Sequence, residues 1–589
     1  MATLTPARFA RAAWYLALAL LVTWPVVLHP VDTVLGHPQA SAACHVWVLW
    51  WARHHVTEIV TPLLFFPYGA DVVTLYGSDV LSPLLLRGLP LPPTLLYNLW
   101  VVLLLVVGGL GVDGLARDRG ATEAGGLLAG TVFATAPFLQ HEALNGTSEI
   151  IGIAALAWFL RALFAVLDRR DDGSWRRPSR HTVVGGLALG LSFSLAVALS
   201  AYNLFFGLVA AGVLTVARLA TSPTPVFRRE QVQALAAAAV GASPIGAFLL
   251  WLQRSHGAAE VYSRRGNWKS DLMALPDAFA SLEMWVDPRP ATIPVVQELP
   301  FGEVFEYWTT CTVYLGLVAL GLGVIGAWRG RRRAPVGSLV ALAVVAALIA
   351  SGPYLRVQGE PVTVLGLRVP MPSLVLADLF PPFVITAVHA YRYAGLVVIA
   401  LALLAGLAVR RWPAAVAAGC LVLGDAVLLS PVPWPAPVTQ RPRSAVLDAL
   451  AAAPDGGVLH VPIEAEHLGD LGRLLLAQTV HGKPVQDGGI HRRAGVAATT
   501  AFREIGLLAG LEARGAPRLP GEKQGRFDLG QLYNLGYRYV LLEEGEESPD
   551  VEAWLERLLG PADEADERWR LWRLEPERIV GREGSGRRP

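Results

Sequence analysis

Charged residues are scarce in this chain of 589 residues. They make up 16% of the sequence, whereas hydrophobic residues make up 53% and the mean hydropathy is +0.44. A composition this apolar excludes an ordinary soluble globular protein and indicates an integral membrane protein. The net charge is +1 and the basic residues are dispersed between apolar runs, which excludes the clustered basic face of a nucleic-acid-binding protein.

Cysteine is also rare. Cys44, Cys311 and Cys420 are too few and too far apart for a disulfide framework or a cysteine-based metal cluster. A single disulfide between Cys44 and Cys311 is the alternative that the sequence leaves. The neighbours His54 and His55 point in different directions on a helix, so they do not make a two-ligand metal site by themselves. The sequence indicates no cofactor and leaves a requirement for a divalent metal unknown.

Long apolar segments are the dominant feature of the first 430 residues. We predict about eleven transmembrane helices from runs of about 20 apolar residues. Arginines cluster on alternate connections, which by the positive-inside rule places the amino terminus in the cytoplasm. Abundant Arg, Ala, Gly and Pro fit a GC-rich bacterial genome, so we expect a multi-pass protein of the bacterial inner membrane. The predicted segments are 11–30, 94–116, 121–139, 149–167, 182–200, 203–219, 231–252, 309–328, 336–350, 392–409 and 412–430.

An odd number of spans puts the remainder of the chain outside the cytoplasm. We expect a transmembrane domain over residues 1–430, a Pro-rich linker over 431–444 and a soluble extracytoplasmic domain over 445–589. In that domain "GGVLHVPI" and "YRYVLLEE" predict strands that alternate with helical patterns, which indicates an α/β fold. The long connections that we expect on the outer side span residues 31–93, 253–308 and 351–391.

The first outer connection contains "HVWVLWWARHHV". Its apolar stripe predicts a helix in the plane of the membrane interface, with Trp47, Trp50 and Trp51 at the depth of the lipid headgroups. Arg53, His54 and His55 would then face water.

Several side chains on the outer connections are suited to catalysis or to phosphate binding. Asp71, Asp79 and Glu142 lie close to predicted helix ends, where partial burial would raise the pKa of a general base, although Asp79 could equally cap a helix. Arginine donates two parallel hydrogen bonds to a phosphate, and an arginine at membrane depth usually has a functional partner. The candidates for phosphate or lipid binding are Arg264, Arg265, Lys269, His389 and Arg392, each of which could instead reach anionic headgroups.

Four stretches of the sequence carry a resemblance to a known superfamily. They follow a first helix and an aromatic outer loop, and they resemble bacterial polytopic glycosyltransferases of the GT-C superfamily. In chain order they are "FFPYG", "YNLWVVLLLVVGGLGVDGLARDRGA", "FATAPFLQHEALNGTSEIIGIAALAWFLRAL" and "RYAG". The likeness is nearest to the mannosyltransferase and YfhO-like groups, and it covers the order of elements through most of the membrane part.

The resemblance implies a membrane glycosyltransferase of the cell envelope. Such an enzyme transfers a sugar, with inversion, from a polyprenyl-phosphate donor in the membrane to a lipid, glycan or protein acceptor on the outer face. An acidic residue of the first outer loop acts as the base, and basic residues hold the donor phosphate. The loop "GHPQASAACHVW" has Gln39, Ala40, Ser41 and Ala42 where that acid is expected.

This departure leaves three alternatives. Asp32 could supply the base, or Asp71, Asp79 or Glu142 could reach in from neighbouring connections, or the chain could be a non-catalytic GT-C-like subunit. A lipid or polysaccharide transporter is a further alternative, for which Asp113 and Asp425 are the ionisable residues within predicted helices.

Overall fold

The computed structural model describes residues 6–38, 40–55, 57, 60–72, 81–168, 180–221, 229–255, 281–287, 292–298, 304–310, 312–332, 334–358, 360–379, 389–461, 463, 468–487, 505–511, 519–544 and 548–580. The chain divides into two compact units. The helical unit comprises Met1–His37, Leu95–Glu303 and Trp308–Val438, and the sheet unit comprises Pro38–Thr94, Val304–Tyr307 and Thr439–Pro589. The first outer connection therefore shares a unit with the carboxyl-terminal part of the chain.

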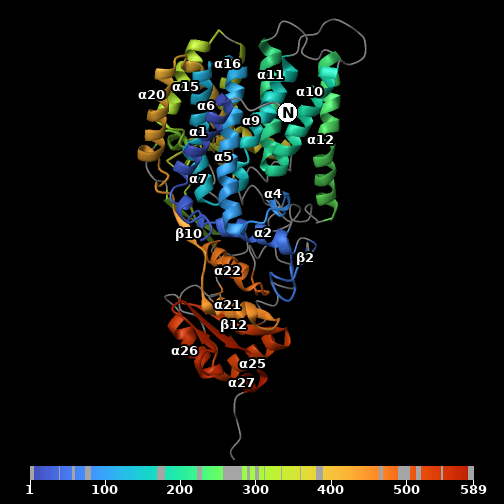
Figure 1. The fold of residues 1–589 in the computed structure, drawn as a ribbon, viewed down its shortest axis with the longest axis vertical. Coiled ribbons are helices and arrows are strands. Elements are labelled where there is room, and N and C mark those ends of the chain that lie inside the picture. The colour runs from blue at the N-terminus through green and yellow to red at the C-terminus, as the bar shows by residue number, and fades with distance from the viewer. Residues whose placement is uncertain are drawn as a thin grey trace, which may run out of the picture. The chain divides into compact units, whose positions relative to one another are not determined.

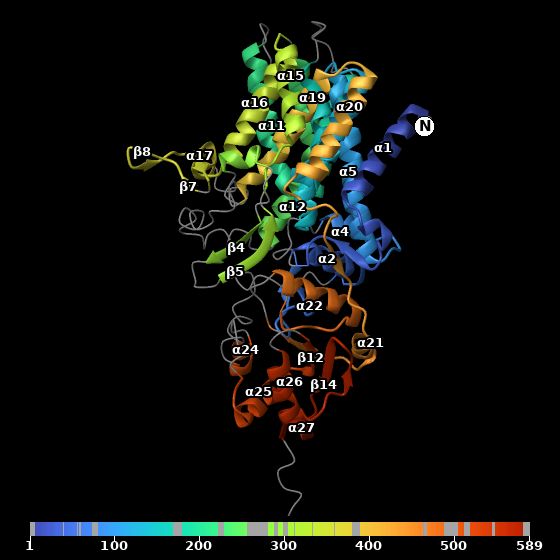
Figure 2. The same cartoon turned by 90° about the vertical axis from the view of Figure 1, so that its left-hand side faces the viewer.

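Each of the eleven predicted apolar segments contains a helix (Figures 1 and 2). Seven helices among the described residues are long and apolar enough to cross a membrane, and Leu317–Gly330 and Val336–Ala350 are shorter apolar helices. These findings identify a multi-pass membrane protein. The main helices are α1 (Pro6–Val22), α5 (Pro93–Asp118), α6 (Glu123–Ala134), α9 (Ala154–Leu167), α10 (Arg180–Leu199), α11 (Tyr202–Thr221), α12 (Arg229–Ser255), α15 (Leu317–Gly330), α16 (Ala334–Ala350), α19 (Ala394–Ala408) and α20 (Trp412–Gly424).

Two predicted boundaries are wrong by several residues. The first segment was predicted to extend to residue 30, but α1 ends at Val22 and a short 3-10 helix, η1 (Val26–Leu28), follows. The segment 309–328 was predicted to be helical from its start, but Thr309 and Thr310 belong to strand β5 (Val304–Thr310) and α15 begins only at Leu317. The β-branched and aromatic residues of β5 favour an extended strand, which pairs with β4 (Thr292–Glu298). Short two-stranded pairs are formed by β2 (Val60–Thr61) with β3 (Ala70–Asp71), β6 (Arg356–Val357) with β7 (Glu360–Pro361), and β8 (Thr363–Val364) with β9 (Leu367–Arg368).

Small residues let helices of the helical unit approach closely. A Cβ atom built on Gly186 of α10 would lie 2.1 Å from the carbonyl oxygen of Ala234 in α12, and one on Gly190 would lie 2.1 Å from that of Ala238. Helices α10 and α12 are therefore in backbone contact, as expected for membrane helices that associate through small residues. Figure 1 shows the two helices side by side.

The two acidic residues within the predicted helices have structural partners. Asp113 lies 2.6 Å from Arg11 and 2.8 Å from Arg117, so it joins α1 to α5. Asp425 accepts hydrogen bonds from the Tyr314 hydroxyl at 2.7 Å and from the backbone N–H of Val318 at 2.8 Å, in the first turn of α15. Both carboxylates are buried and hydrogen-bonded to neighbouring elements. These bonds explain why the helices contain acidic residues, without a role in a transport pathway.

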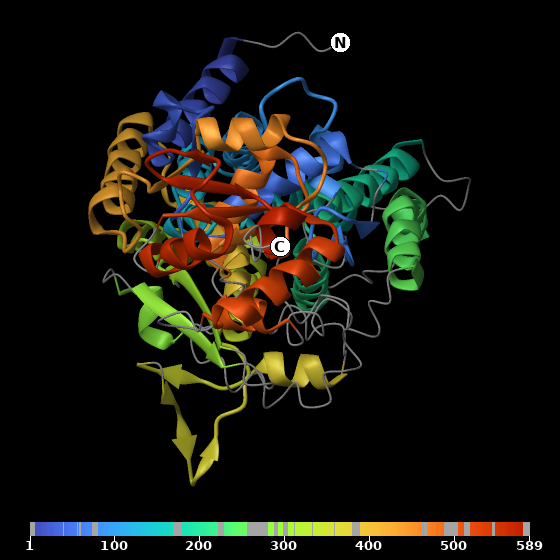
Figure 3. The same ribbon diagram turned by 90° about the horizontal axis from the view of Figure 1, so that it is seen from below.

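The sheet unit contains a four-stranded sheet between two layers of helices, in agreement with the predicted α/β fold (Figures 1 and 3). Strand β11 (Gly457–Val461) runs parallel to β12 (Tyr537–Glu543), and β12 pairs antiparallel with β14 (Trp569–Arg573), which in turn pairs with β13 (Glu564–Ala565). One face packs on α21 (Ala445–Ala452) and α22 (Leu468–His481), and α2 (Ala42–His54) packs on α22. The other packs on α24 (Gly506–Leu511), α25 (Glu522–Asn534), α26 (Ser548–Leu559) and α27 (Pro576–Val580).

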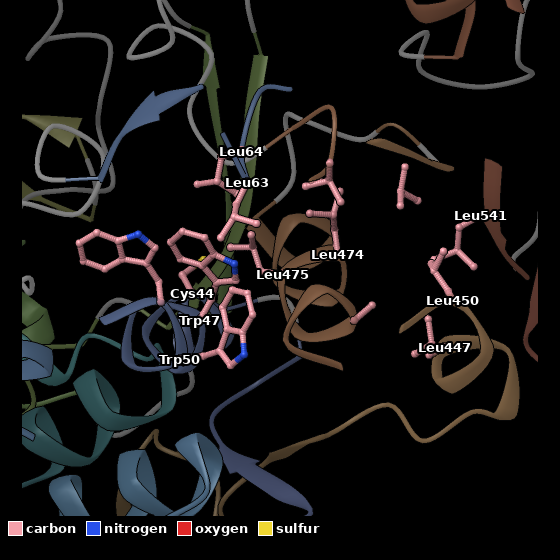
Figure 4. Close-up of a cluster of buried hydrophobic side chains, with 14 of the residues drawn as sticks. Cys44, Trp47, Trp50, Leu63, Leu64, Leu447, Leu450, Leu474, Leu475 and Leu541 are labelled. Atoms are coloured by element: carbon pink, nitrogen blue, oxygen red, sulfur yellow. The ribbon is translucent and has the colours of Figure 1, made fainter. Parts of the chain in front are cut away.

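The tryptophans of α2 belong to the core of the sheet unit. Trp47 and Trp51 are 0% and 1% exposed, and Trp50 is 9% exposed. Figure 4 shows Trp47 and Trp50 beside Leu474 and Leu475 of α22. Trp47 Nε1 also donates to Gln478 Oε1 at 2.7 Å. Packing against α22 thus replaces the headgroup contact expected for these side chains, because a neighbouring apolar helix face can bury the indole rings as well as lipid can.

Cys44, in the same cluster, is a buried free thiol, and Cys311, its predicted alternative partner, lies outside the described residues.

The contact between α10 and α12 yields a stability prediction. Replacing Gly190 by Leu places a side chain against the backbone of α12. Because this backbone cannot move aside as a flexible side chain could, the two helices must separate, and the thermal midpoint of the detergent-purified protein should fall by several degrees. Gly246→Leu, on α12, is the control because a Cβ at that position has no neighbouring atom within 4 Å. Equal midpoints for the two variants would contradict the close helix contact.

Candidate functional site

A tight turn after α7 (Pro137–Leu144) positions the acidic residue of the candidate site. Pro137 begins this helix, whose last turn carries His141 and Glu142, and Asn145 caps its end. Gly146 has a φ of +70°, a conformation that favours glycine, and it reverses the chain into α8 (Ser148–Ile151). The turn closes with a 2.9 Å hydrogen bond from Thr147 N to Glu142 O.

Glu142 is fully buried at the end of α7. The Thr147 hydroxyl donates to Glu142 Oε2, and Thr147 Oγ1 also lies 2.9 Å from the Glu142 backbone oxygen. Glu142 Oε1 lies 3.7 Å from His141 Nδ1, and Oε1 has no hydrogen-bond partner in the described part of the chain. The His141 ring is held from its other side, because Nε2 lies 2.8 Å from Asn145 Nδ2. One carboxylate oxygen is thus anchored and the other is left for a further partner.

Arg392 faces this carboxylate from the 3-10 helix η5 (Ala390–Tyr393). Its Nε lies 3.9 Å from Glu142 Oε2 and has no hydrogen-bond partner among the residues described. The guanidinium carbon lies 4.9 Å from the centre of the Tyr202 ring and 5.9 Å from that of Tyr391. The two aromatic rings hold the guanidinium by cation–π contact, and Nε is the donor that has no hydrogen-bond partner among the described residues.

Burial shifts the pKa values of both residues at the end of α7. Desolvation raises the pKa of Glu142, and the charge of Arg392 and hydrogen bonds from Thr147 and Tyr391 oppose this shift in part. Desolvation and the charge of Arg392 lower the pKa of His141 to about 3, so its ring is neutral at pH 7. A carboxyl group with a raised pKa, held beside a cation, has the properties of a general base that works near neutral pH.

Asp32 lies on a half-buried segment of the helical unit, between η1 (Val26–Leu28) and β1 (Thr33–Leu35). The Asn98 side chain holds this segment by donating to the backbone oxygens of Pro30 and Thr33 at 2.9 and 2.7 Å. A few residues farther on, His37 N donates to Leu144 O at 3.0 Å, which ties the start of the first outer connection to the end of α7. This connection therefore begins beside the helix that carries Glu142.

The other predicted site residues are distributed over the chain. His389 precedes η5, with its ring centre 6.3 Å from that of Tyr391, so it belongs to the surroundings of Arg392. Asp71 ends β3 in the sheet unit, opposite Val60. Asp79, Arg264, Arg265 and Lys269 lie outside the described residues. The structure thus brings together Glu142, Arg392 and His389 from the predicted set.

Three contributors escaped the sequence analysis. Tyr202 and Tyr391 hold the guanidinium of Arg392, although the aromatic flanks of "AYRY" around this arginine are visible in the sequence. Thr147 stands at the N-cap position of α8, but its hydroxyl donates to Glu142 and not to the helix. Among the described residues, no group of three His, Cys, Asp or Glu side chains is placed to hold a metal ion.

No protein-family model and no curated protein matches this chain. Solved structures of three proteins illustrate what the chain is similar to. The apo oligosaccharyltransferase of Archaeoglobus fulgidus has a TM-score of 0.47 and 11% identity over 93% of this chain and 71% of that one. Mycobacterial arabinofuranosyltransferase AftD has a TM-score of 0.47 and 15% identity over 91% of this chain and 35% of that one. ArnT from Cupriavidus metallidurans bound to undecaprenyl phosphate has a TM-score of 0.42 and 13% identity over 96% and 98%.

The contact between Thr147 and Glu142 can be tested through stability. Thr147→Val removes the hydroxyl that donates to the buried carboxyl group, which should cost about 1–3 kcal/mol and lower the thermal midpoint. Thr135→Val is the matched control, because the buried hydroxyl of Thr135 donates to the carbonyl oxygen of Thr131, four residues earlier in the chain. If Thr147→Val lowers the thermal midpoint no more than Thr135→Val does, the contact between Thr147 and Glu142 is refuted.

Proposed function

We propose that this protein is a membrane glycosyltransferase that moves a sugar from a polyprenyl-phosphate donor to an acceptor hydroxyl on the outer face of the membrane. The observation that carries the proposal is the burial of Glu142 beside Arg392, with one unbonded oxygen on the carboxylate and an unbonded Nε on the guanidinium among the described residues. The sequence resemblance to GT-C glycosyltransferases supports the same reading.

Each of the two charged side chains, Glu142 and Arg392, has one role in this reaction. Glu142 takes the proton from the acceptor hydroxyl as its oxygen attacks the anomeric carbon of the donor sugar. The bond between that carbon and the phosphate oxygen breaks with inversion, and its electron pair goes to the departing polyprenyl phosphate. Arg392 stabilises the negative charge that develops on this phosphate, at a buried position where water screens the interaction little.

Glu142 is preferred to Asp32 as the base because of its surroundings. Glu142 has a raised pKa and lies 3.9 Å from Arg392, whereas Asp32 is half-buried on the segment held by Asn98. The 3.9 Å separation is longer than a hydrogen bond, so a ligand that binds Arg392 Nε or Glu142 Oε1 does not have to break a direct hydrogen bond between the two side chains. The chain lacks an acid in "QASA", and Glu142 supplies a carboxylate from the neighbouring connection instead.

The first test is the loss of transfer in Glu142→Gln. This change keeps the size of the side chain but removes its basicity, so we expect transfer to fall by about 10²–10⁴-fold. The measurement is the glycolipid and surface-glycan profile, by mass spectrometry, of a gene-deletion strain complemented with each variant. Glu123→Gln, at an exposed carboxylate paired with Arg11, is the matched control and should restore the profile fully.

Asp32→Asn in the same strain separates the two candidate bases. If the glycan profile is lost in Asp32→Asn and retained in Glu142→Gln, the catalytic base is Asp32 and not Glu142. If the deletion changes the profile and neither substitution does, a non-catalytic role is supported and the proposed reaction is refuted.

The raised pKa of Glu142 predicts how transfer depends on pH. A base works only when deprotonated, so transfer in membrane vesicles should decline on the acidic side as pH falls through the raised pKa of this carboxyl group. Thr147→Val removes a hydrogen bond that lowers this pKa, so the acidic limb should move to higher pH. An acidic limb that stays in place in Thr147→Val would contradict the assignment of the limb to Glu142.

A further inference from the structure

The connection between α16 and η5 contains an apolar hairpin that the proposed reaction does not use. Strands β8 and β9 pair antiparallel, with Val364 opposite Leu367. Leu365 and Gly366 form the two-residue loop between the strands. Val364, Leu365 and Leu367 are 57%, 98% and 74% exposed. Figures 2 and 3 show this pair, in yellow, projecting from the rest of the helical unit. Large apolar side chains that gather on an exposed surface mark a place of interaction.

The backbone of the tip holds a leucine in a conformation that leucine disfavours. Leu365 has a φ of +53° and Gly366 a φ of +77°, as in the type I′ turns that join paired strands. Glycine, asparagine and aspartate are favoured at the first of these positions, because the left-handed conformation strains a larger side chain. Leu365 therefore costs free energy through its backbone and also through its exposure to water. An apolar environment around the tip would remove the second of these costs.

The base of the hairpin is held by backbone hydrogen bonds and ends in polar side chains. Leu355 N donates to Val369 O at 3.0 Å, and Val369 N donates to Val362 O at 3.0 Å. Next to the tip, the guanidinium carbon of Arg368 lies 5.7 Å from the centre of the Tyr354 ring. An apolar tip followed by arginine and tyrosine has the order of side chains found across a membrane interface, where arginine and tyrosine lie among the headgroups.

The exposed tip continues an apolar surface of the helical unit. Val344 and Leu348 are exposed and lie four residues apart on one face of α16, an apolar helix without a charged residue. Helix α17 (Pro372–Leu379), which follows the hairpin and packs on α16, exposes Val375 and Leu379 at the same spacing. In a multi-pass membrane protein, such outward apolar stripes face lipid. A hairpin that projects sideways shortly after the end of α16 therefore lies along the bilayer (Figure 2).

We propose that β8 and β9 form an interfacial anchor whose tip, Val364–Leu367, inserts into the boundary between the lipid headgroups and the acyl chains. The apolar side chains of the tip leave water there, and Arg368 keeps its charge among the headgroups. A protein partner is disfavoured by size, because the tip offers four residues whereas a stable protein interface takes about 20–30 residues a side. The anchor would fix the connection that leads from α16 to η5, and it does not depend on transfer at Glu142.

Site-specific photocrosslinking of the full-length protein in bacterial membranes tests the anchor. The probe is the photoreactive residue benzoylphenylalanine, introduced as Leu365→benzoylphenylalanine and, in a second variant, as Leu367→benzoylphenylalanine. After irradiation, mass spectrometry of the tip peptide should find adducts of phospholipid mass at both positions, since both side chains would lie in the bilayer. The second variant keeps the test valid if the first fails to fold.

Two controls accompany the probes. Asp550→benzoylphenylalanine places the same group at an exposed position in the first turn of α26, in the sheet unit, and its lipid adducts should be severalfold fewer. Glu142→Gln, added to the Leu365 probe, should leave the adduct yield unchanged, which separates the anchor from the proposed reaction.

Three results would overturn the proposal. The first is a crosslink from the tip to another protein, which would make the hairpin a partner-binding surface. The second is a crosslinked species of twice the mass of this chain, which would make it a contact between two copies. The third is a yield of lipid adducts at both tip positions no higher than at Asp550, which would leave the tip in water.

Discussion

A carboxylate and a guanidinium buried together among apolar helices impose the main constraint on the helical unit. An isolated charge in such surroundings costs several kcal/mol, so Glu142 and Arg392 depend on each other and on the groups around them. The turn at Gly146 directs Thr147 onto the carboxyl group, and the rings of Tyr202 and Tyr391 hold the guanidinium.

The buried acidic residues fall into two groups according to how they are bonded. Asp113 and Asp425 are bonded at 2.6–2.8 Å to arginines or to backbone and hydroxyl donors, and they hold helices together. Glu142 has one anchored oxygen, and its cation, Arg392, lies 3.9 Å away. Complete pairing suits a structural role, whereas an incompletely bonded carboxylate beside a cation suits a group that receives a ligand.

The sequence predicted the helices and the α/β part because apolar runs and alternating strands have periods that reflect local geometry. It also singled out Glu142 and Arg392, since charged residues near apolar helix ends are conspicuous. It could not pair them, because they are 250 positions apart and only the folded bundle brings them together. Trp47 and Trp51 were misplaced for the same reason, as an aromatic helix has the same pattern whether it faces lipid or α22. The boundary at residues 309–316 failed because β5 is as apolar as the start of a helix.

The central claim is that Glu142 and Arg392 bind the reacting groups of a lipid-linked donor and its acceptor. It is tested most directly by a cryo-EM structure of the full-length protein in nanodiscs with added polyprenyl phosphate. The account predicts phosphate density within hydrogen-bond distance of the Arg392 guanidinium, with Glu142 on the side from which an acceptor would approach. Phosphate density away from Arg392, or a guanidinium closed onto the carboxylate with the lipid bound elsewhere, would contradict it.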